Sequence, residues 1–152
     1  MKKLYPLLSV LFLIYWGCEE EQPEEVDTTP TEVTLWGVTY SVEDTDSLDL
    51  TFNDLTGSIP PEIELLINLT YLNLGYNQLI GPIPSEIGNL TNLTYLTLYN
   101  NQLTETIPES ICDLNINWSN AHDLNISDNK LCPPYPSCIE DYVGEQDTSN
   151  CD

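Results

Sequence analysis

The chain has 152 residues and a formal net charge of −22 at pH 7, because 25 Asp and Glu residues face only three Lys or Arg residues. Nucleic-acid binding depends on basic contacts to phosphates, so this charge balance excludes a nucleic-acid partner. It also opposes adhesion to anionic lipid headgroups and self-association, and we therefore expect a monomer.

The first 17 residues have the layout of a secretory signal. Lys2 and Lys3 precede an apolar run from Leu4 to Trp16. This run is shorter than the roughly 20 residues that a membrane-spanning helix needs. A basic start followed by a short apolar run is typical of a signal peptide. We therefore expect residues 1–17 to be removed on export.

The residues around Cys18 resemble the lipobox of bacterial lipoproteins, in which Gly17 precedes a Cys that becomes lipidated. Tyr15 and Trp16 depart from the aliphatic and small residues usual in that motif. The resemblance implies a bacterial outer-membrane or cell-surface lipoprotein that meets the membrane only through its anchor. The acidic run at 19–21 resembles an export signal to the outer face. Ordinary cleavage beside an incidental Cys18 is the alternative.

Residues 18–32 begin with that Cys and continue as an acidic segment that is rich in Pro and Thr. Such a segment cannot bury enough apolar surface to offset the entropy lost on ordering. Charge repulsion, Pro23 and Pro30 favour an extended chain. We expect a disordered stalk here.

Apolar residues alternate through residues 33–47. They are Val33, Leu35, Trp36, Val38, Tyr40 and Val42. The alternation predicts a strand or hairpin, and a repeat array needs such a cap at its open end. The segment contains no Cys, so we expect Trp36 and Tyr40 to close this N-terminal cap by packing.

A 24-residue period begins at residue 48. The residues that recur at offsets of 24 and 48 are Leu48, Leu50, Asn53, Leu55, Ile59, Pro60 and Ile63. A period of this size indicates stacked supersecondary units. Leu-x-Leu predicts a short strand with both leucines inward, and an inward Asn must be hydrogen-bonded, with the next coil supplying partners. Ile-Pro then begins a convex segment, because Pro fixes φ and lacks a donor.

These positions resemble the plant-type leucine-rich repeat, LxxLxLxxNxLtGxIPxxIgxL, over residues 48–131. The resemblance implies an α/β solenoid: a short right-handed coil with about four parallel strands on the concave side and convex 3-10 or helical turns. At the ends of this coil we expect the aromatic N-terminal cap described above and a disulfide-bonded C-terminal cap over residues 132–152.

The third and fourth units depart from the pattern. Gly57 and Gly81 are replaced by Glu105 in the third unit, which predicts a less tightly bent turn there. The fourth strand, at Leu124, follows the third at an offset of 28. We expect the four extra residues to form a convex loop that ends the array, with Trp118 shielding the last coil.

Four Cys residues besides Cys18 lie in the last part of the chain: Cys112, Cys132, Cys138 and Cys151. This even number in an exported chain predicts two disulfides, and their spacing leaves three pairings open. The segment from Cys132 to Cys138 resembles the closing loop of plant-type repeat caps, which implies Cys132–Cys138 with Cys112–Cys151. There is no CxxC and a single His, His122, so no metal or other cofactor is expected.

The outward positions of the four strands form columns across the sheet. The candidate binding residues in them are Tyr71, Asn73, Tyr76, Tyr95, Thr97, Tyr99 and Asn125. Tyrosine beside small polar residues provides rigid, amphipathic contact area. The columns therefore predict a binding surface for a protein, peptide or glycan. The alternative is that Tyr merely suits strands and stacks across them.

No catalytic pattern is present: the sequence lacks a GxSxG elbow and a phosphate-cradling Gly loop. The carboxylates do not follow EF-hand spacing either. The chain is therefore not expected to be an enzyme. Two hypotheses remain: a surface-anchored binding module, with enzyme inhibition as in some plant repeat proteins as a subtype, and a structural coat or spacer lipoprotein without a specific ligand.

Overall fold

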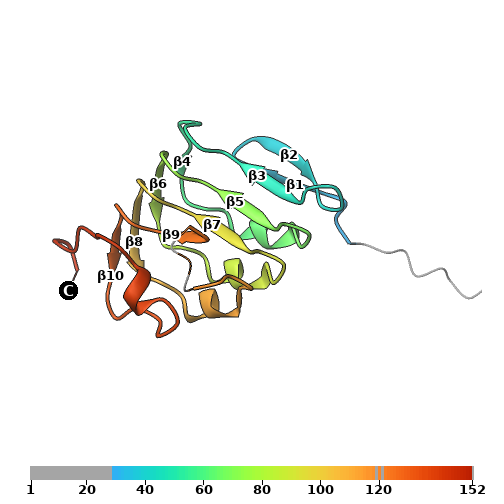
Figure 1. Ribbon diagram of the computed structural model, residues 1–152. Coiled ribbons are helices and arrows are strands. Elements are labelled where there is room, and N and C mark those ends of the chain that lie inside the picture. Colours follow the sequence, from blue (N-terminus) through green and yellow to red (C-terminus); the bar gives the residue numbers. More distant parts are fainter. Residues whose placement is uncertain (1–28, 119, 121, 152) are drawn as a thin grey trace, which may run out of the picture.

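The computed structural model describes residues 29–118, 120 and 122–151. The predicted signal peptide, Cys18 and most of the predicted stalk lie outside these residues. The described part of the chain winds into a short solenoid, with the β1–β2 hairpin at one end and the C-terminal segment at the other (Figure 1). Within that part, no helix is long and apolar enough to cross a membrane.

One side of the solenoid is the predicted parallel sheet, here called the concave sheet. Its strands, in spatial order, are β3 (Ser47–Asp49), β5 (Tyr71–Asn73), β7 (Tyr95–Thr97) and β9 (Leu124–Asn125). Leu72 pairs with Leu48 on one side and with Leu96 on the other, and Leu96 pairs with Leu124. Successive coils therefore stack with the repeat's own register, including the longer last unit.

A second parallel sheet, which the repeat pattern did not predict, forms another side. Its strands are β4 (Thr56–Gly57), β6 (Gln78–Gly81), β8 (Gln102–Thr106) and β10 (Lys130–Cys132). Leu79, Leu103 and Leu131 point inward from it and are fully buried. These strands are too short for an alternation to stand out in the sequence.

The third side consists of 3-10 helices that follow the Ile-Pro pairs. They are η1 (Pro61–Leu65), η2 (Ser85–Asn89) and η3 (Glu109–Asp113). Ile63, Ile87 and Ile111 face the core and are fully buried. The predicted convex turns are thus confirmed. Neighbouring turns pack closely, because a Cβ at Gly88 would collide with the backbone of Ser110.

Buried asparagines connect successive coils, as the repeat predicted. Asn101 donates to the carbonyls of Leu74 and Leu98, both at 2.9 Å, and accepts from the Leu79 amide at 3.0 Å. Asn77 and Asn129 make the same kinds of bonds. Such side chains satisfy backbone groups that the short strands leave unpaired.

The first asparagine of the series does not follow this rule. Asn53 is exposed, and its side-chain amide donates to the Thr51 carbonyl two residues away, at 2.9 Å, and not to a neighbouring coil of the described chain. The prediction of an inward Asn is wrong in this unit. The reason is that no preceding coil offers Asn53 the backbone groups that Asn77 finds on Leu50 and Leu55.

The N-terminal cap is an antiparallel hairpin of β1 (Glu32–Leu35) and β2 (Val38–Ser41). Trp36 and Gly37 form its two-residue turn, both with positive φ, as a type I′ hairpin turn requires. Val33 and Leu35 are buried, whereas Trp36 and Tyr40 are half-buried against the core. The predicted hairpin is confirmed. Its aliphatic residues, Val33 and Leu35, are more deeply buried in the core than its aromatic residues, Trp36 and Tyr40.

The turn at Glu105 is not relaxed, so that expectation is wrong. Glu105 has φ of 67°, close to 80° at Gly57 and 77° at Gly81. A left-handed non-glycine residue costs on the order of 1 kcal/mol. Glu105 lies in β8, which pairs with β6 and β10 in the second sheet. These pairings hold the backbone in the conformation that Gly adopts elsewhere.

The C-terminal cap contains two disulfides, but the pairing implied by family resemblance is wrong. The bonds are Cys112–Cys138 and Cys132–Cys151. Cys132 ends β10 in the second sheet, whereas Cys138 pairs with a residue of η3. Residues 133–138 therefore run from one side of the solenoid to another and do not close a local loop. Trp118 is half-buried against the core, in the loop that holds the extra residues.

A degenerate fifth coil ends the array after η4 (Glu140–Tyr142). Gln146 accepts from the Leu131 amide at 3.1 Å and donates to the carbonyls of Ile126 and Val143. These bonds reproduce those of the buried asparagines, with Val143 in the position of the strand leucine three residues earlier. The Asp128 amide likewise donates to Glu145, at 2.7 Å. The cap thus continues the bonding pattern for one further turn.

Candidate functional site

The outward face of the concave sheet brings the predicted columns together. Tyr71 pairs with Tyr95, and Asn73 pairs with Thr97, in adjacent β5 and β7. Thr97 in turn pairs with Asn125 of β9. Alternate residues of a strand point to opposite faces of a sheet. Since the leucines between them point into the core, these side chains all lie on the outer face of the concave sheet.

Tyr71 and Tyr95 form a stacked pair on this face. Their ring centroids are 4.3 Å apart and the rings are tilted by 7°. Both are half-buried, and the Asn73 amide approaches the Tyr71 hydroxyl at 3.4 Å. In-register aromatic neighbours stabilise adjacent strands, so part of the role of this pair is structural.

A second aromatic cluster lies at the ends of the strands and consists of Phe52, Tyr76 and Tyr99. Phe52 stacks on Tyr76 at 4.2 Å, and Tyr76 meets Tyr99 edge-on at 4.7 Å. The Tyr76 and Tyr99 hydroxyls are 2.6 Å apart. Phe52 is 70% exposed and was absent from the predicted site. Its column, which places it one period before Tyr76, was the available signal.

Phe52 and Tyr76 occupy left-handed backbone positions, with φ of 56° and 51°. The corresponding residues of the next two coils, Asn100 and Asp128, both have φ of 55°. Asn and Asp suit this conformation, whereas bulky residues rarely adopt it. Two large aromatics are therefore held, exposed, where the backbone favours small polar residues. A strained residue of this kind is a reason to consider a functional role.

The polar column on the face is largely engaged in local turns. Asn73 accepts from the Gly75 amide at 3.0 Å, and Asn125 accepts from the Ser127 amide at 3.1 Å. Asp49 makes the same contact with Thr51 at 3.0 Å. These contacts are Asx turns. They shape the ends of the strands, so Asn73 and Asn125 have structural roles whatever else they contact.

Thr97 does not offer the accessible contact that the sequence predicted. It is 7% exposed, and its hydroxyl donates to the Asn125 carbonyl at 3.1 Å. Along the chain, Tyr95 and Tyr99 lie two residues away on either side and so share its face. In the neighbouring strands, Asn73 and Asn125 pair with Thr97. Larger side chains around it therefore exclude solvent.

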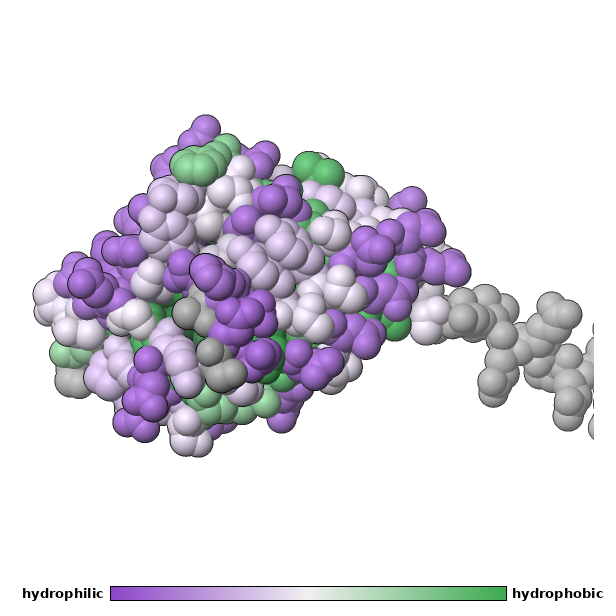
Figure 2. Space-filling view, viewed as in Figure 1, coloured by the Kyte–Doolittle hydropathy of each residue, from purple (hydrophilic) through white to green (hydrophobic). Residues whose placement is uncertain are grey.

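Nearby carboxylates contribute to the acid–base behaviour of two tyrosines, Tyr95 and Tyr99. Burial raises the pKa of Tyr95, and neighbouring Tyr71, Asp49 and Asp123 raise it further. The hydrogen bond to Tyr76 chiefly raises the pKa of Tyr99, with a smaller contribution from Asp128. Both hydroxyls therefore stay protonated throughout the physiological range. Figure 2 shows hydrophilic residues over much of the viewed side and no broad strongly hydrophobic patch.

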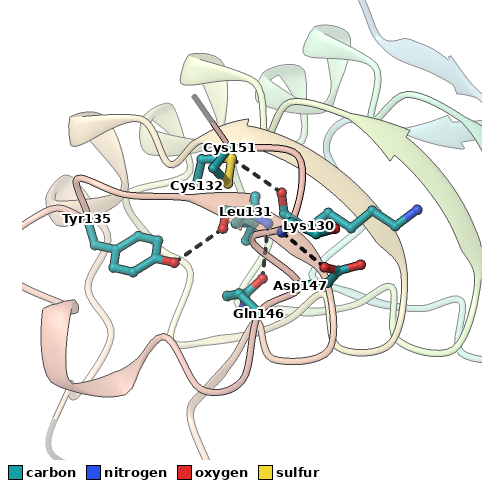
Figure 3. Close-up of a disulfide and its surroundings, with 8 residues drawn as sticks. Lys130, Leu131, Cys132, Tyr135, Gln146, Asp147 and Cys151 are labelled. Atoms are coloured by element: carbon teal, nitrogen blue, oxygen red, sulfur yellow. Dashed lines mark hydrogen bonds between the residues drawn. A yellow bond between two sulfur atoms is a disulfide. The ribbon is translucent and has the colours of Figure 1, made fainter.

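A polar groove of about 410 Å³ lies where the last coils meet the C-terminal cap. Its lining residues are Asn101, Asp128, Asn129, Lys130, Glu145, Gln146 and Asp147. Lys130 is the only Lys or Arg in the described part of the chain. Its side chain extends away from the Cys132–Cys151 disulfide (Figure 3). Within the described residues no group of three or more His, Cys, Asp or Glu side chains could hold a metal ion.

Comparisons with known proteins bear on this surface. Residues 43–103 match the family model described as leucine rich repeat. A structure of the plant peptide hormone receptor RGFR1 in complex with RGF2 is 47% identical over 57% of this chain, with a TM-score of 0.52. The Arabidopsis receptor kinase HAESA, in complex with the peptide hormone IDA and the co-receptor SERK1, is 35% identical over 68% of this chain, with a TM-score of 0.57.

A plant ice-binding protein is also similar, at 35% identity over 59% of this chain and a TM-score of 0.52. The matched region spans only 13% of the RGFR1 chain, 18% of the HAESA chain and 27% of the ice-binding chain. Comparison with curated proteins gives no match. The likeness therefore concerns the repeat coils and not the whole architecture of those larger proteins.

Proposed function

The chain is a leucine-rich repeat protein, and from this premise we propose that it is an exported binding module with its ligand site on the concave sheet. The exposed, left-handed Phe52 and Tyr76 carry the proposal, together with the tyrosines stacked beside them. Similar coils occur in plant receptors solved with peptide hormones. Two disulfides suit an oxidising compartment outside the cytoplasm.

The size of the sheet restricts the ligand. Four strands have three gaps of about 4.8 Å, which gives a face roughly 14 Å wide. A standard protein interface uses about 800 Å² on each partner, more than four short strands supply. The site therefore suits a short peptide, a glycan, or a small part of a protein surface. Anchoring through lipidated Cys18, at the start of the acidic stalk, would place many copies on one surface. Several weak sites could then engage one ligand-bearing partner at the same time.

The second candidate is a coat or spacer lipoprotein without a specific ligand. Two observations favour it: Thr97 is buried, and Asn73 and Asn125 already accept hydrogen bonds from their own strand ends. Under this alternative the aromatic clusters only stabilise the sheet. The two functions therefore differ in whether removal of the tyrosines affects binding or stability.

The decisive variant is the triple substitution Tyr71→Ala, Tyr95→Ala and Tyr99→Ala, assayed on peptide and glycan arrays. We expect binding to disappear while the coils stay folded, because the leucine core beneath is untouched. A control variant removes exposed apolar groups elsewhere: Val38→Ala, Ile67→Ala and Tyr142→Ala. This control should bind as the parent does. Retained binding by the tyrosine variant, and by the same variant with Phe52→Ala and Tyr76→Ala added, would refute use of the concave sheet.

A further inference from the structure

The charged groups on the concave sheet are all of one sign. Asp49 lies in β3, Asp123 directly precedes β9, and Asp128 follows it. The four strands contain no Lys or Arg. Lys130, the single such residue described, lies in β10 of the second sheet. A ligand on this face therefore meets carboxylates that no cation of these strands neutralises.

These carboxylates lie close enough to the tyrosines to affect them. Asp123 lies beside Tyr95, because they directly precede Leu124 and Leu96, which pair between β9 and β7. Asp49 lies in β3, two strands from Tyr95, and both charges help to raise the pKa of Tyr95. Asp128 acts on Tyr99 in the same way. Each aromatic cluster thus has at least one carboxylate beside its hydroxyl groups.

Tyrosine rings flanked by carboxylates form a favourable environment for an organic cation. The electron-rich face of a ring attracts a guanidinium or ammonium group within about 6 Å, and the attraction is on the order of 0.5–1 kcal/mol at exposed sites. A guanidinium can also donate paired hydrogen bonds to a carboxylate while its plane stacks on the ring. Phe52 adds an exposed ring without a hydroxyl, which extends the surface for aliphatic stems.

The width of the sheet fits an extended peptide. Side chains on one side of an extended chain recur about every 6.8 Å. Residues i and i+4 are therefore about 14 Å apart, which matches the distance across three strand gaps. Two basic side chains at this spacing reach the Asp49 side and the Asp123 side together.

The same charges disfavour other occupants. A second copy of this chain, with a formal net charge of −22, is repelled. Nucleic acids and anionic glycans are repelled for the same reason. A neutral glycan can stack on tyrosines and donate hydroxyl hydrogen bonds to the carboxylates, but it brings no positive charge to balance theirs.

We propose that the concave sheet binds an extended basic peptide, with Arg or Lys side chains over the tyrosines and beside Asp49, Asp123 and Asp128. The proposal rests on the proposed function and names the chemistry of its ligand. Arg is favoured over Lys, because its planar group stacks on rings and pairs with carboxylates simultaneously.

The test uses the full chain in detergent and a labelled nonapeptide that alternates Ser and Arg. A counterpart with citrulline, an uncharged isostere of Arg, controls for shape. At low salt we expect the Arg peptide to bind roughly tenfold or more tightly than the citrulline peptide, by fluorescence anisotropy, and the difference should shrink at 1 M salt, where the screening length is about 3 Å.

A matched pair of variants separates the site from general attraction to an acidic protein. Asp49→Asn, Asp123→Asn and Asp128→Asn remove three charges, and Asn already occupies the positions equivalent to Asp49 and Asp128 in other coils, at 73 and 100. The control Glu62→Gln, Glu109→Gln and Glu140→Gln removes three exposed charges from the 3-10 helices. We expect roughly tenfold weaker binding in the first variant and less than about twofold in the second.

Each other outcome is informative. Equal weakening in both variants, or equal binding of the citrulline peptide, overturns the basic-peptide inference. If neither peptide binds but a neutral ligand on the arrays requires Tyr71, Tyr95 and Tyr99, the inference fails and the proposed function stands. If the tyrosine variant binds every probe as the parent does, the proposed function fails first.

Discussion

The two ends of the solenoid cover the exposed core of the repeat array in different ways. The N-terminal cap is a regular hairpin that pairs its own backbone and covers the core with Val33 and Leu35. The C-terminal cap is mostly irregular and relies on two disulfides and on Gln146. The difference indicates that a regular cap needs only an apolar face. An irregular cap must obtain backbone partners and covalent restraint from the coils.

The largest expected effect comes from the covalent restraint. The double substitution Cys112→Ser and Cys138→Ser should lower the free energy of unfolding by about 2–5 kcal/mol, since a disulfide restricts the unfolded chain. Urea unfolding of the two proteins measures the difference. No Cys lies in residues 33–47, so reducing agent should expose residues 132–151 to protease before the hairpin. Simultaneous cleavage at both ends would contradict the claim that only the C-terminal cap depends on disulfides.

A smaller effect compares the hydrogen-bonding side chains at the two ends. Gln146→Leu removes the partner of the Leu131 amide and of the Val143 carbonyl, and should cost about 1–3 kcal/mol. The Ile126 carbonyl loses one of two donors and keeps its bond from Asn129. Asn53→Leu at the other end should cost less than about 0.5 kcal/mol, because Asn53 is exposed. Chemical denaturation curves of both variants decide the matter. Similar losses at the two positions would mean that Gln146 is not part of the bonding series.

Glu105→Gly tests the coil that leads into the C-terminal cap. Glycine accepts the left-handed conformation of this turn without a steric cost, but it also raises the entropy of the unfolded chain. We expect a net gain of up to about 1 kcal/mol in unfolding free energy. Differential scanning calorimetry measures the shift in Tm. A lower Tm would show that the Glu105 side chain contributes more than its backbone strain costs.

The smallest effect is an acid dependence confined to the C-terminal cap. Hydrogen bonds from Ser149, and to a lesser degree the charge of Lys130, lower the pKa of Asp147 below its ordinary value of 3.8. A carboxylate with a lowered folded pKa contributes stability above its unfolded pKa, and this contribution disappears as the pH falls through the folded pKa. Asp147→Asn should therefore narrow the Tm difference between pH 7 and pH 3. An unchanged difference would remove Asp147 from the cap's acid response.

Much of the fold was predictable because the repeat constrains each position in the same way. The inward Leu and Ile, the inward Asn of the later coils and the convex turns follow from the period. The second sheet could not be predicted from the period. Its strands have only two to five residues, too few to show an alternation of apolar and polar residues. Gln146 was missed because Val-x-x-Gln differs in both residue types from Leu-x-x-Asn, although its amide performs the same bonding.

The candidate site was predictable as columns but not as contacts. The sequence placed Tyr71 beside Tyr95, and strand register confirmed that neighbourhood. It could not indicate that Thr97 is buried or that Phe52 belongs to the exposed cluster. Both depend on how neighbouring rings rotate and stack, which no linear spacing encodes.

By itself the sequence determined the period, the register of the coils and the acidic character of the protein. The first two follow from residue types at a fixed spacing, and the third follows from the count of charged residues. Only the tertiary structure decided which Cys residues pair, which polar side chains find partners in another coil, and which aromatics stay exposed. Those outcomes depend on distances between residues far apart in the chain. The Cys112–Cys138 bond is the plainest case, because the path of residues 133–138 brings together two sulfurs that the sequence alone could not associate.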